Sequence, residues 1–303
     1  MLSKFYGEIF AILTSVCWAI SALSFEIAGK KIGSLPMNLI RMSLALIFIS
    51  IFSVFYNGNI IPQGANSEQL LYLVASGLVG FVIGDMLLFH SFVLIGARLG
   101  TLMMTMVAPI SAIISWFALK EKMSLWQIFA MLVTIAGIFI VIYSRNKNHK
   151  KIEAKTKKAS ILFLGFLLAF GGAIGQAGGL VLSKKGVLNY DAFSASHIRI
   201  ITGFLGYILI ISFTRLWKKV FAGLKNTSAL KTVSFGSFLG PFLGMSFSLI
   251  AVKNTSTGIA ATLTSLAPVI IIIPAIFINK EKVSFLEILG AFIAVIGVAL
   301  FFI

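Results

Sequence analysis

Long apolar runs alternate with short polar connectors along the chain. A helix needs about 20 mostly apolar residues to cross the hydrocarbon of a bilayer. By that measure the sequence predicts ten membrane-spanning helices, near residues 6–28, 36–57, 69–93, 98–118, 125–144, 160–182, 193–214, 232–252, 257–278 and 285–303. Because the runs are continuous instead of alternating, a membrane β-barrel is excluded. The pattern predicts an all-α integral membrane protein, multi-pass in the cytoplasmic membrane.

The composition excludes a soluble domain. Of the 303 residues, 59% are hydrophobic and 11% are charged, whereas a soluble domain carries about 25% charged residues. A soluble chain of this length cannot bury so much apolar surface, since part of any fold stays exposed to water. The net charge of +16 is then explained by lysines and arginines near anionic lipid. We expect no nucleic-acid partner, because the basic connectors are too short to form such a surface.

One set of motifs occurs twice. Each copy has an Ala-Pro pair, a Lys-Glu-Lys turn and a Ser-x-x-Gln/Glu capping box that starts the next helix. The first copy is Ala108-Pro109, Lys120-Glu121-Lys122 and Ser124 with Gln127. The second copy is Ala267-Pro268, Lys280-Glu281-Lys282 and Ser284 with Glu287. Matches that recur near one offset indicate an internal duplication.

Further matches extend this duplication over both halves. Gly80 and Gly84 align with Gly240 and Gly244, Gly137 with Gly297, and Arg41 with Arg199. We assign residues 1–145 to a first five-helix repeat, 146–158 to a basic linker and 159–303 to a second five-helix repeat. Because each repeat has an odd number of spans, the second enters the membrane from the opposite side. The sequence therefore predicts ten transmembrane helices arranged as an inverted 5+5 repeat.

These paired motifs resemble the EamA-type transporters of the drug/metabolite transporter superfamily, over essentially the whole chain. The chain departs from the family pattern at Lys120 and Lys280, where a glycine is usual, and at Asp85, within a span that is commonly uncharged. The resemblance implies a gradient-driven metabolite carrier, often an exporter. It also implies a central cavity lined by the first, third, fourth, sixth, eighth and ninth spans.

Lysine and arginine gather in alternate connectors. The connectors that follow the odd-numbered spans hold 17 of the 25 lysines and arginines. The positive-inside rule places such connectors in the cytoplasm. The sequence therefore predicts a cytoplasmic linker between the repeats and both termini outside.

Polar groups inside the membrane are costly and usually face a cavity. Asp85, near the middle of the third span, is the candidate contact for a substrate ammonium group and the candidate proton carrier. The alternative is an acid kept neutral, or ion-paired with a basic residue for packing. Its repeat partner is Met245. Trp18 and its repeat partner Gln176 flank the inferred cavity, where the Trp face either binds an organic cation or serves packing.

The two prolines predict kinks in the fourth and ninth spans. Pro109 and Pro268 each leave one backbone carbonyl without its helical donor. Thr262 and Ser265, near Pro268, either replace such a missing bond or bind substrate. Ser111 is the corresponding hydroxyl near Pro109.

The remaining charged residues have simpler expectations. Arg41 and Arg199 lie near span ends and can snorkel to the interface, although a substrate carboxylate or phosphate could pair with either. Glu8 and Glu26 lie near the two ends of the first span and are expected to contact headgroups or water. His90 is expected to be a packing histidine.

The sequence predicts no metal, cofactor or catalytic site. Cys17 is the single cysteine, and His90, His149 and His197 lie on separate segments without ligand spacing. No phosphate-binding glycine loop or metalloprotease motif is present. We therefore expect no enzyme activity and no direct use of ATP.

Three functions are compatible with such a sequence. The first is a secondary transporter that moves a small organic metabolite, such as an amino acid or amine, by alternating access, with export driven by a gradient. The alternative is a flippase of the same fold for a lipid or lipid-linked substrate. A third, an integral membrane enzyme, needs clustered acids or histidines at one interface. The expected partners are a small-molecule substrate, protons as coupling ion and membrane lipids, for a monomer or homodimer.

Overall fold

The structure, a computed structural model, describes residues 5–149, 157–270 and 284–300. In these ranges the chain is helical apart from short connectors, and no strand occurs. The first half comprises α1 (Tyr6–Ile32), α2 (Ser34–Asn57), α3 (Ser67–Ser76), η2 (Gly77–Gly84), α4 (Asp85–Met104), α5 (Val107–Leu119) and α6 (Leu125–His149). The second half comprises α7 (Lys157–Val187), α8 (Ala192–Thr214), α9 (Trp217–Lys225), α10 (Thr227–Ser237), η3 (Phe238–Gly244), α11 (Met245–Asn254), α12 (Thr257–Thr264), α13 (Ala267–Ile270) and α15 (Phe285–Ala299).

Six helical stretches are long and apolar enough to cross a membrane. They are Tyr6–Ile32, Ser34–Asn57, Ser67–Ala97, Phe163–Val187, Ala192–Thr214 and Thr227–Asn254. The other predicted spans coincide in the described residues with shorter apolar helices, which are Val107–Leu119, Leu125–Ile140, Thr257–Ile270 and Ile288–Gly297. The all-α membrane fold is therefore confirmed.

The helix ends differ from prediction at the linker. Helix α6 extends to His149 and α7 begins at Lys157, so helix covers both ends of the segment 146–158 that we assigned to the linker. Residues 150–156 lie outside the described part. The turn at Lys280–Lys282 also lies outside it. The capping box at the start of α6 is confirmed, because the Ser124 backbone N–H donates to Gln127 Oε1 at 3.0 Å and the Gln127 N–H donates to Ser124 Oγ at 3.2 Å.

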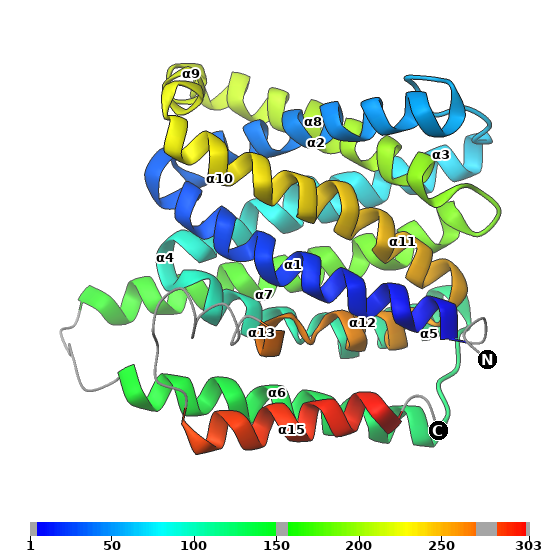
Figure 1. Cartoon of the computed structure of the whole chain (residues 1–303), viewed down its shortest axis with the longest axis vertical. Helices are drawn as coiled ribbons and strands as arrows, with labels where there is room; N and C mark the ends of the chain where they lie inside the picture. Colours follow the sequence, from blue (N-terminus) through cyan, green and yellow to red (C-terminus); the bar gives the residue numbers. More distant parts are fainter. Residues whose placement is uncertain (1–4, 150–156, 271–283, 301–303) are drawn as a thin grey trace.

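Most contacts between helices recur when the two halves are exchanged. Helix α1 packs on α10, η3 and α11, while its counterpart α7 packs on α3, η2 and α4. Helix α2 packs on α8, α5 on α12, and α6 on α15. In Figure 1, α1 runs from the N-terminus at the right towards the left, whereas α7 runs from left to right. The two halves therefore begin at opposite ends of the molecule.

Both halves contain a π-helical segment at the same place. The segments η2 (GLVGFVIG) and η3 (FLGPFLG) interrupt the third and eighth predicted spans. The π-helix is rare and often marks a functional site. Each segment ends where the backbone N–H of the next residue bonds five residues back, from Asp85 to Gly80 and from Met245 to Gly240. Asp85 thus starts α4 directly after the widened turn.

Glycine allows η2 to lie against α7 with the two backbones in contact. A Cβ atom at Gly175 would lie 2.7 Å from the Cα of Gly84, and one at Gly179 would lie 2.9 Å from the Cα of Gly80. Any side chain would push the helices apart. These contacts fix Gln176, the residue after Gly175, beside the end of η2.

A break interrupts the helix just before each Ala-Pro pair. The turn at Thr105–Met106 separates α4 from α5, and the turn at Ser265–Leu266 separates α12 from α13. Pro109 lies in the first turn of α5 and Pro268 in the first turn of α13, where a missing N–H costs no helical bond. An earlier bend lies within α4 at Gly96, whose φ of 83° and ψ of 157° are not helical.

Candidate functional site

A cavity lies between the two halves of the molecule. Its empty volume is about 800 Å³ with the open solvent at its mouth included, and about 100 Å³ of it can hold the centres of water-sized molecules. The first half contributes lining residues from α1, α2, η2, α4 and α5, and the second half from α7, η3, α11, α12, the following turn and α13. The cavity expected from the family resemblance is therefore present, with α2 as an additional wall.

Much of the cavity wall is aromatic or apolar. Trp18 and Phe25 come from α1, and Phe89 and Phe92 from α4. Phe25 and Phe89 meet edge to face with ring centroids 5.2 Å apart, a preferred geometry for aromatic pairs. These rings give an organic solute an apolar surface to pack against.

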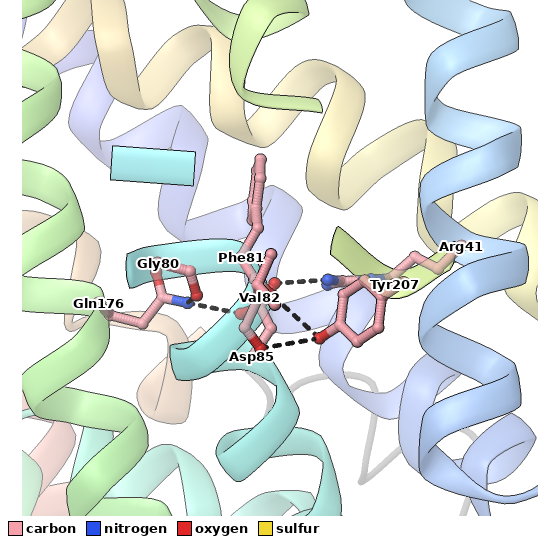
Figure 2. A network of polar contacts seen from close by, with 7 residues as sticks. All are labelled: Arg41, Gly80, Phe81, Val82, Asp85, Gln176 and Tyr207. Atoms are coloured by element: carbon pink, nitrogen blue, oxygen red, sulfur yellow. Dashed lines mark hydrogen bonds and ion pairs between the residues drawn. The ribbon is translucent and has the colours of Figure 1, made fainter. Parts of the chain in front are cut away.

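A buried row of polar side chains crosses one wall of the cavity (Figure 2). The Arg41 guanidinium donates through Nη2 to Asp85 Oδ2 at 2.5 Å, and Gln176 Nε2 donates to Asp85 Oδ1 at 2.5 Å. Figure 2 shows Asp85 between these two partners. The three residues are 3–9% exposed. They belong to α2, α4 and α7, so residues from both halves build the row, which we call the polar belt.

The π-helix η2 supports the polar belt from behind. Gln176 Nε2 also donates to the carbonyl of Gly80 at 3.1 Å. The hydroxyl of Tyr207, from α8, donates to the carbonyl of Phe81 at 2.9 Å. Side chains of the second half therefore bind carbonyls of the widened turn, which holds Asp85 in place.

Arg41 and Arg199 correct one expectation from the sequence. We expected both to reach the membrane interface, but Arg41 is 3% and Arg199 is 1% exposed. The guanidinium of Arg41 lies over the rings of Phe25 and Phe89, at 5.2 and 4.4 Å from their centroids. Both side chains point into the molecule because the interior offers an anion or aromatic rings there.

Four of the five predicted substrate-binding residues line the same cavity: Asp85, Trp18, Gln176 and Ser265. Thr262 is fully buried but is not part of the lining, and its hydroxyl donates to the carbonyl of Gly258 at 2.7 Å. The hydroxyl of Ser265 donates to the carbonyl of Ala261 at 2.8 Å. Both hydroxyls therefore bond to their own helix.

Two other expectations differ from the structure. The ring of His90 is exposed instead of packed, and its Nδ1 lies 3.2 Å from Ser34 Oγ. Glu26 is partly buried, with its side chain 19% exposed, and binds protein groups: its Oε2 accepts the backbone N–H of Ala97 at 3.0 Å and its Oε1 accepts from Lys30 at 2.5 Å. This carboxylate caps the helix that restarts after the bend at Gly96.

A second polar cluster lies at the opposite end of α1 from Glu26. Glu121, in the turn before α6, pairs with Lys184 of α7 and accepts the backbone N–H of Thr257 at 2.9 Å. Lys184 also donates to the carbonyl of Thr255 at 2.6 Å, and the hydroxyl of Thr255 donates to Glu8 Oε1 at 2.9 Å. We call these five residues the end latch, since they join α1, α7 and α12 at one end.

The end latch holds Glu121 ionised. Burial raises the pKa of its carboxyl, but the hydrogen bonds from Lys184 and from the Thr257 backbone, with the charge of Lys184, outweigh it and bring the pKa below the ordinary value of 4.5. Glu8 precedes Trp18 by ten residues, or about 15 Å of helix. The α1 residues that line the cavity run from Trp18 to Phe25. The cavity therefore extends from mid-helix away from the end latch.

Comparison with known proteins decides the family. A sequence model of the EamA-like transporter family matches the chain twice, over residues 5–143 and 163–303. The chain belongs to the EamA-like transporter family. Both matches together cover nearly all of it, one in each half. The transporter is thus a multi-pass membrane protein that moves small solutes.

The relatives of this EamA-like transporter agree with that assignment. It is 22% identical over 293 residues to an uncharacterized transporter of Clostridium kluyveri, covering 96% of this chain and 91% of the relative. It is 24% identical over 180 residues to human solute carrier family 35 member G1, covering 59% of this chain and 48% of the human protein. A solved crystal structure shares the fold, with a TM-score of 0.71, 14% identity and coverage of 97% of this chain and 94% of that chain.

The sequence alone missed three features of the site. Arg41 was expected near the interface and not beside Asp85, although its repetition as Arg199 was a signal. The π-helices had a weaker signal in the paired glycines Gly80 and Gly240. The pairing of Glu121 with Lys184 joins residues 63 positions apart, and no local pattern indicates such a contact.

Proposed function

We propose that this EamA-like protein is a secondary transporter that carries a small organic solute through the cavity by alternating access, as a gradient-driven exporter. The observation that carries the proposal is the cavity itself, lined by both halves and crossed by the polar belt. Buried polar groups inside a membrane are costly, so they are typical of a binding site or pathway.

The proposal includes ten transmembrane helices in an inverted 5+5 repeat, with residues 1–145 and 159–303 as the repeats. The exchange-symmetric helix contacts and the opposite directions of α1 and α7 support it (Figure 1). Inverted repeats are common in secondary transporters because they give two equivalent conformations, one open to each side. We propose that the end latch closes one end of the pathway in one of these two conformations.

We propose that the solute lies against Trp18 and the aromatic wall, with its polar group near Asp85, Gln176 and Ser265. Thr262 then does not contact the solute and instead stabilises α12 through its hydrogen bond to the carbonyl of Gly258. An amino acid, an amine or a related metabolite suits such a mixed surface. A proton or an ammonium group at Asp85 must compete with Arg41 and Gln176, since both carboxylate oxygens already accept hydrogen bonds.

Counterflow in proteoliposomes tests this function. Vesicles that contain the purified protein are loaded with unlabelled solutes and assayed for uptake of the radiolabelled solute, in parallel with a lipid-scrambling assay. We expect counterflow of at least one organic solute and its loss in Trp18→Ala. Trp116→Ala is the matched control, because Trp116 is 57% exposed and lines no part of the cavity.

Scrambling of lipids without solute counterflow would instead support the flippase. Counterflow that persists unchanged in Trp18→Ala would place the pathway outside this cavity.

A further inference from the structure

The buried charges at the centre of the protein do not balance. Three charged residues have buried side chains in the described part of the chain. Two are the arginines Arg41 and Arg199, and the third is the carboxylate Asp85. Asp85 is bonded to Arg41. A charge taken out of water is strongly unfavourable unless a counter-charge accompanies it. Asp85 also acts electrostatically on Arg199, but it forms its ion pair with Arg41, so one excess positive charge remains and Arg199 has no ion pair.

The two arginines occupy equivalent positions in the two halves but donate hydrogen bonds to different residues. Arg41 donates through Nη2 to Asp85, and Arg199 donates through Nη1 to the sulfur of Met245 at 3.1 Å. Met245 is the repeat partner of Asp85, and each of the two residues directly follows a π-helix. The second half therefore has the arginine of this pair but a thioether in place of the carboxylate. A thioether is a weak acceptor and carries no charge.

Polar atoms around both arginines remain unbonded within the described part of the chain. The Nε atoms of Arg41 and Arg199 have no hydrogen-bond partner. Three residues earlier on the same helices, Asn38 and Ser196 are fully buried, and their side-chain polar atoms also have no partner there. Asn38 and Ser196 are repeat partners at the offset of the two arginines. Each half thus has spare donor capacity beside its arginine.

Arg199 lies directly behind the cavity wall. Its guanidinium contacts Met245 and lies 5.0 Å from the ring centroid of Phe81. Both of these residues line the cavity. Met is a flexible side chain with several accessible rotamers. A rotation of Met245 would open the guanidinium of Arg199 to a molecule in the cavity.

We propose that the transported solute is an organic anion, whose carboxylate or phosphate group pairs with Arg199 in the place that Asp85 takes beside Arg41. This inference rests on the proposed function, because it assigns a substrate class to the same cavity. The anion supplies the missing counter-charge, while the aromatic wall packs against the apolar part of the solute. Arginine suits this role because its planar donors match carboxylate and phosphate groups.

The test compares three probes of similar size: phenylacetate, phenylacetamide and phenethylamine. Binding is measured by calorimetry on the purified protein and transport by counterflow in proteoliposomes. We expect phenylacetate to bind about tenfold more tightly than the neutral amide, as for other desolvated charge pairs. Met245→Asp supplies the missing carboxylate within the protein and should abolish that preference. Met245→Asn, which is matched in shape but neutral, should keep it.

Thermal stability gives a readout that needs no probe. Met245→Asp should unfold at a higher temperature than Met245→Asn, because the new carboxylate compensates Arg199. A lower unfolding temperature for Met245→Asp than for Met245→Asn would overturn the inference. So would an anion preference that Met245→Asp leaves intact.

The outcomes separate this inference from the proposed function. Counterflow of the amide or the amine at the rate of phenylacetate would contradict the assignment of an anionic substrate but would still support transport of small solutes. Labelled phosphatidylglycerol and phosphatidylcholine test a lipid as the source of the anionic group. Scrambling of phosphatidylglycerol alone, lost in Met245→Asp and without solute counterflow, would support the anion site and overturn the proposed function.

Discussion

The ion pair between Arg41 and Asp85 changes what a substitution of Asp85 should do. If Asp85 were only a proton carrier, Asp85→Asn would abolish proton-coupled transport and leave folding intact. Both side chains are buried and bonded to each other at 2.5 Å. Removal of one partner therefore leaves the other charge buried without a counter-charge. Such a loss costs about 3–5 kcal/mol. We therefore expect Asp85→Asn to lower the unfolding temperature as well as transport.

A double variant distinguishes the pair from a general loss of packing. Replacing a whole buried ion pair with apolar residues is often close to neutral, so Arg41→Met with Asp85→Leu should recover most of the stability that either single change loses. The measurement is the unfolding temperature of the four proteins in one detergent. Additive losses would mean that the two residues do not act as a pair.

At the level of the helices, the close approach of η2 and α7 makes a sharp prediction. Gly175→Ala would place a Cβ atom 2.7 Å from the Cα of Gly84, so the helices must separate and Gln176 must move away from Asp85. We expect loss of solute counterflow and a lower unfolding temperature. Gly178→Ala is the matched control on the same helix, since its Cβ would meet only Val79 Cγ1 at 3.3 Å.

Equal effects of Gly175→Ala and Gly178→Ala would show that backbone contact between η2 and α7 is unimportant. Circular dichroism of both variants checks that the helix content is unchanged.

Hydropathy and internal repetition predicted most of the helices and part of the site. The apolar runs predicted the positions of the long helices, and the family resemblance implied a central cavity lined by the spans that carry Trp18, Asp85 and Gln176. The burial of Arg41 was not predictable in this way. Hydropathy averaged over a window identifies the length of an apolar helix, but it contains no information on which residues a given side chain contacts in the fold. Thr262 illustrates the same limit, since its hydroxyl bonds within α12.

At the level of the whole molecule, the end latch should control access from its end. We expect Glu121→Gln to open that end, because the ion pair with Lys184 is lost. Ala260 is 1% exposed and lies one turn into α12. A cysteine introduced at this position should react with a maleimide in the Glu121→Gln protein and stay unlabelled in the protein that keeps Glu121. Cys17, the single native cysteine, is replaced by Ser in both proteins. Equal labelling in both would contradict the latch.

The latch also predicts a dependence on pH. Because the pKa of Glu121 lies below its ordinary value of 4.5, the ion pair contributes its full stabilisation above pH 4.5 and loses it as the pH falls through the lowered pKa. The unfolding temperature should therefore fall on acidification, and this part of the fall should be absent in Glu121→Gln. Identical pH profiles for the two proteins would exclude Glu121 as the cause.

The distribution of lysines and arginines predicts the orientation of the chain in the membrane. The positive-inside rule predicts that the linker between the halves is cytoplasmic. A cysteine at position 153 should resist a membrane-impermeant maleimide in intact cells and react after the cells are opened. A cysteine at position 64, in the connector after α2, should react in intact cells. The reverse pattern would place both termini in the cytoplasm.

The carboxylate that Arg199 lacks has a consequence for the kinetics of transport. With the proposed anion bound, the centre of the protein is electrically neutral, so the proposed change between two conformations moves no net charge through the membrane voltage. In that cycle the empty protein returns with one uncompensated positive charge, whose free energy changes by about 2.3 kcal/mol per 100 mV if the charge crosses the full field. A negative interior should therefore speed the return of an empty exporter to the inside and with it net export. Exchange of one anion for another should not depend on the voltage.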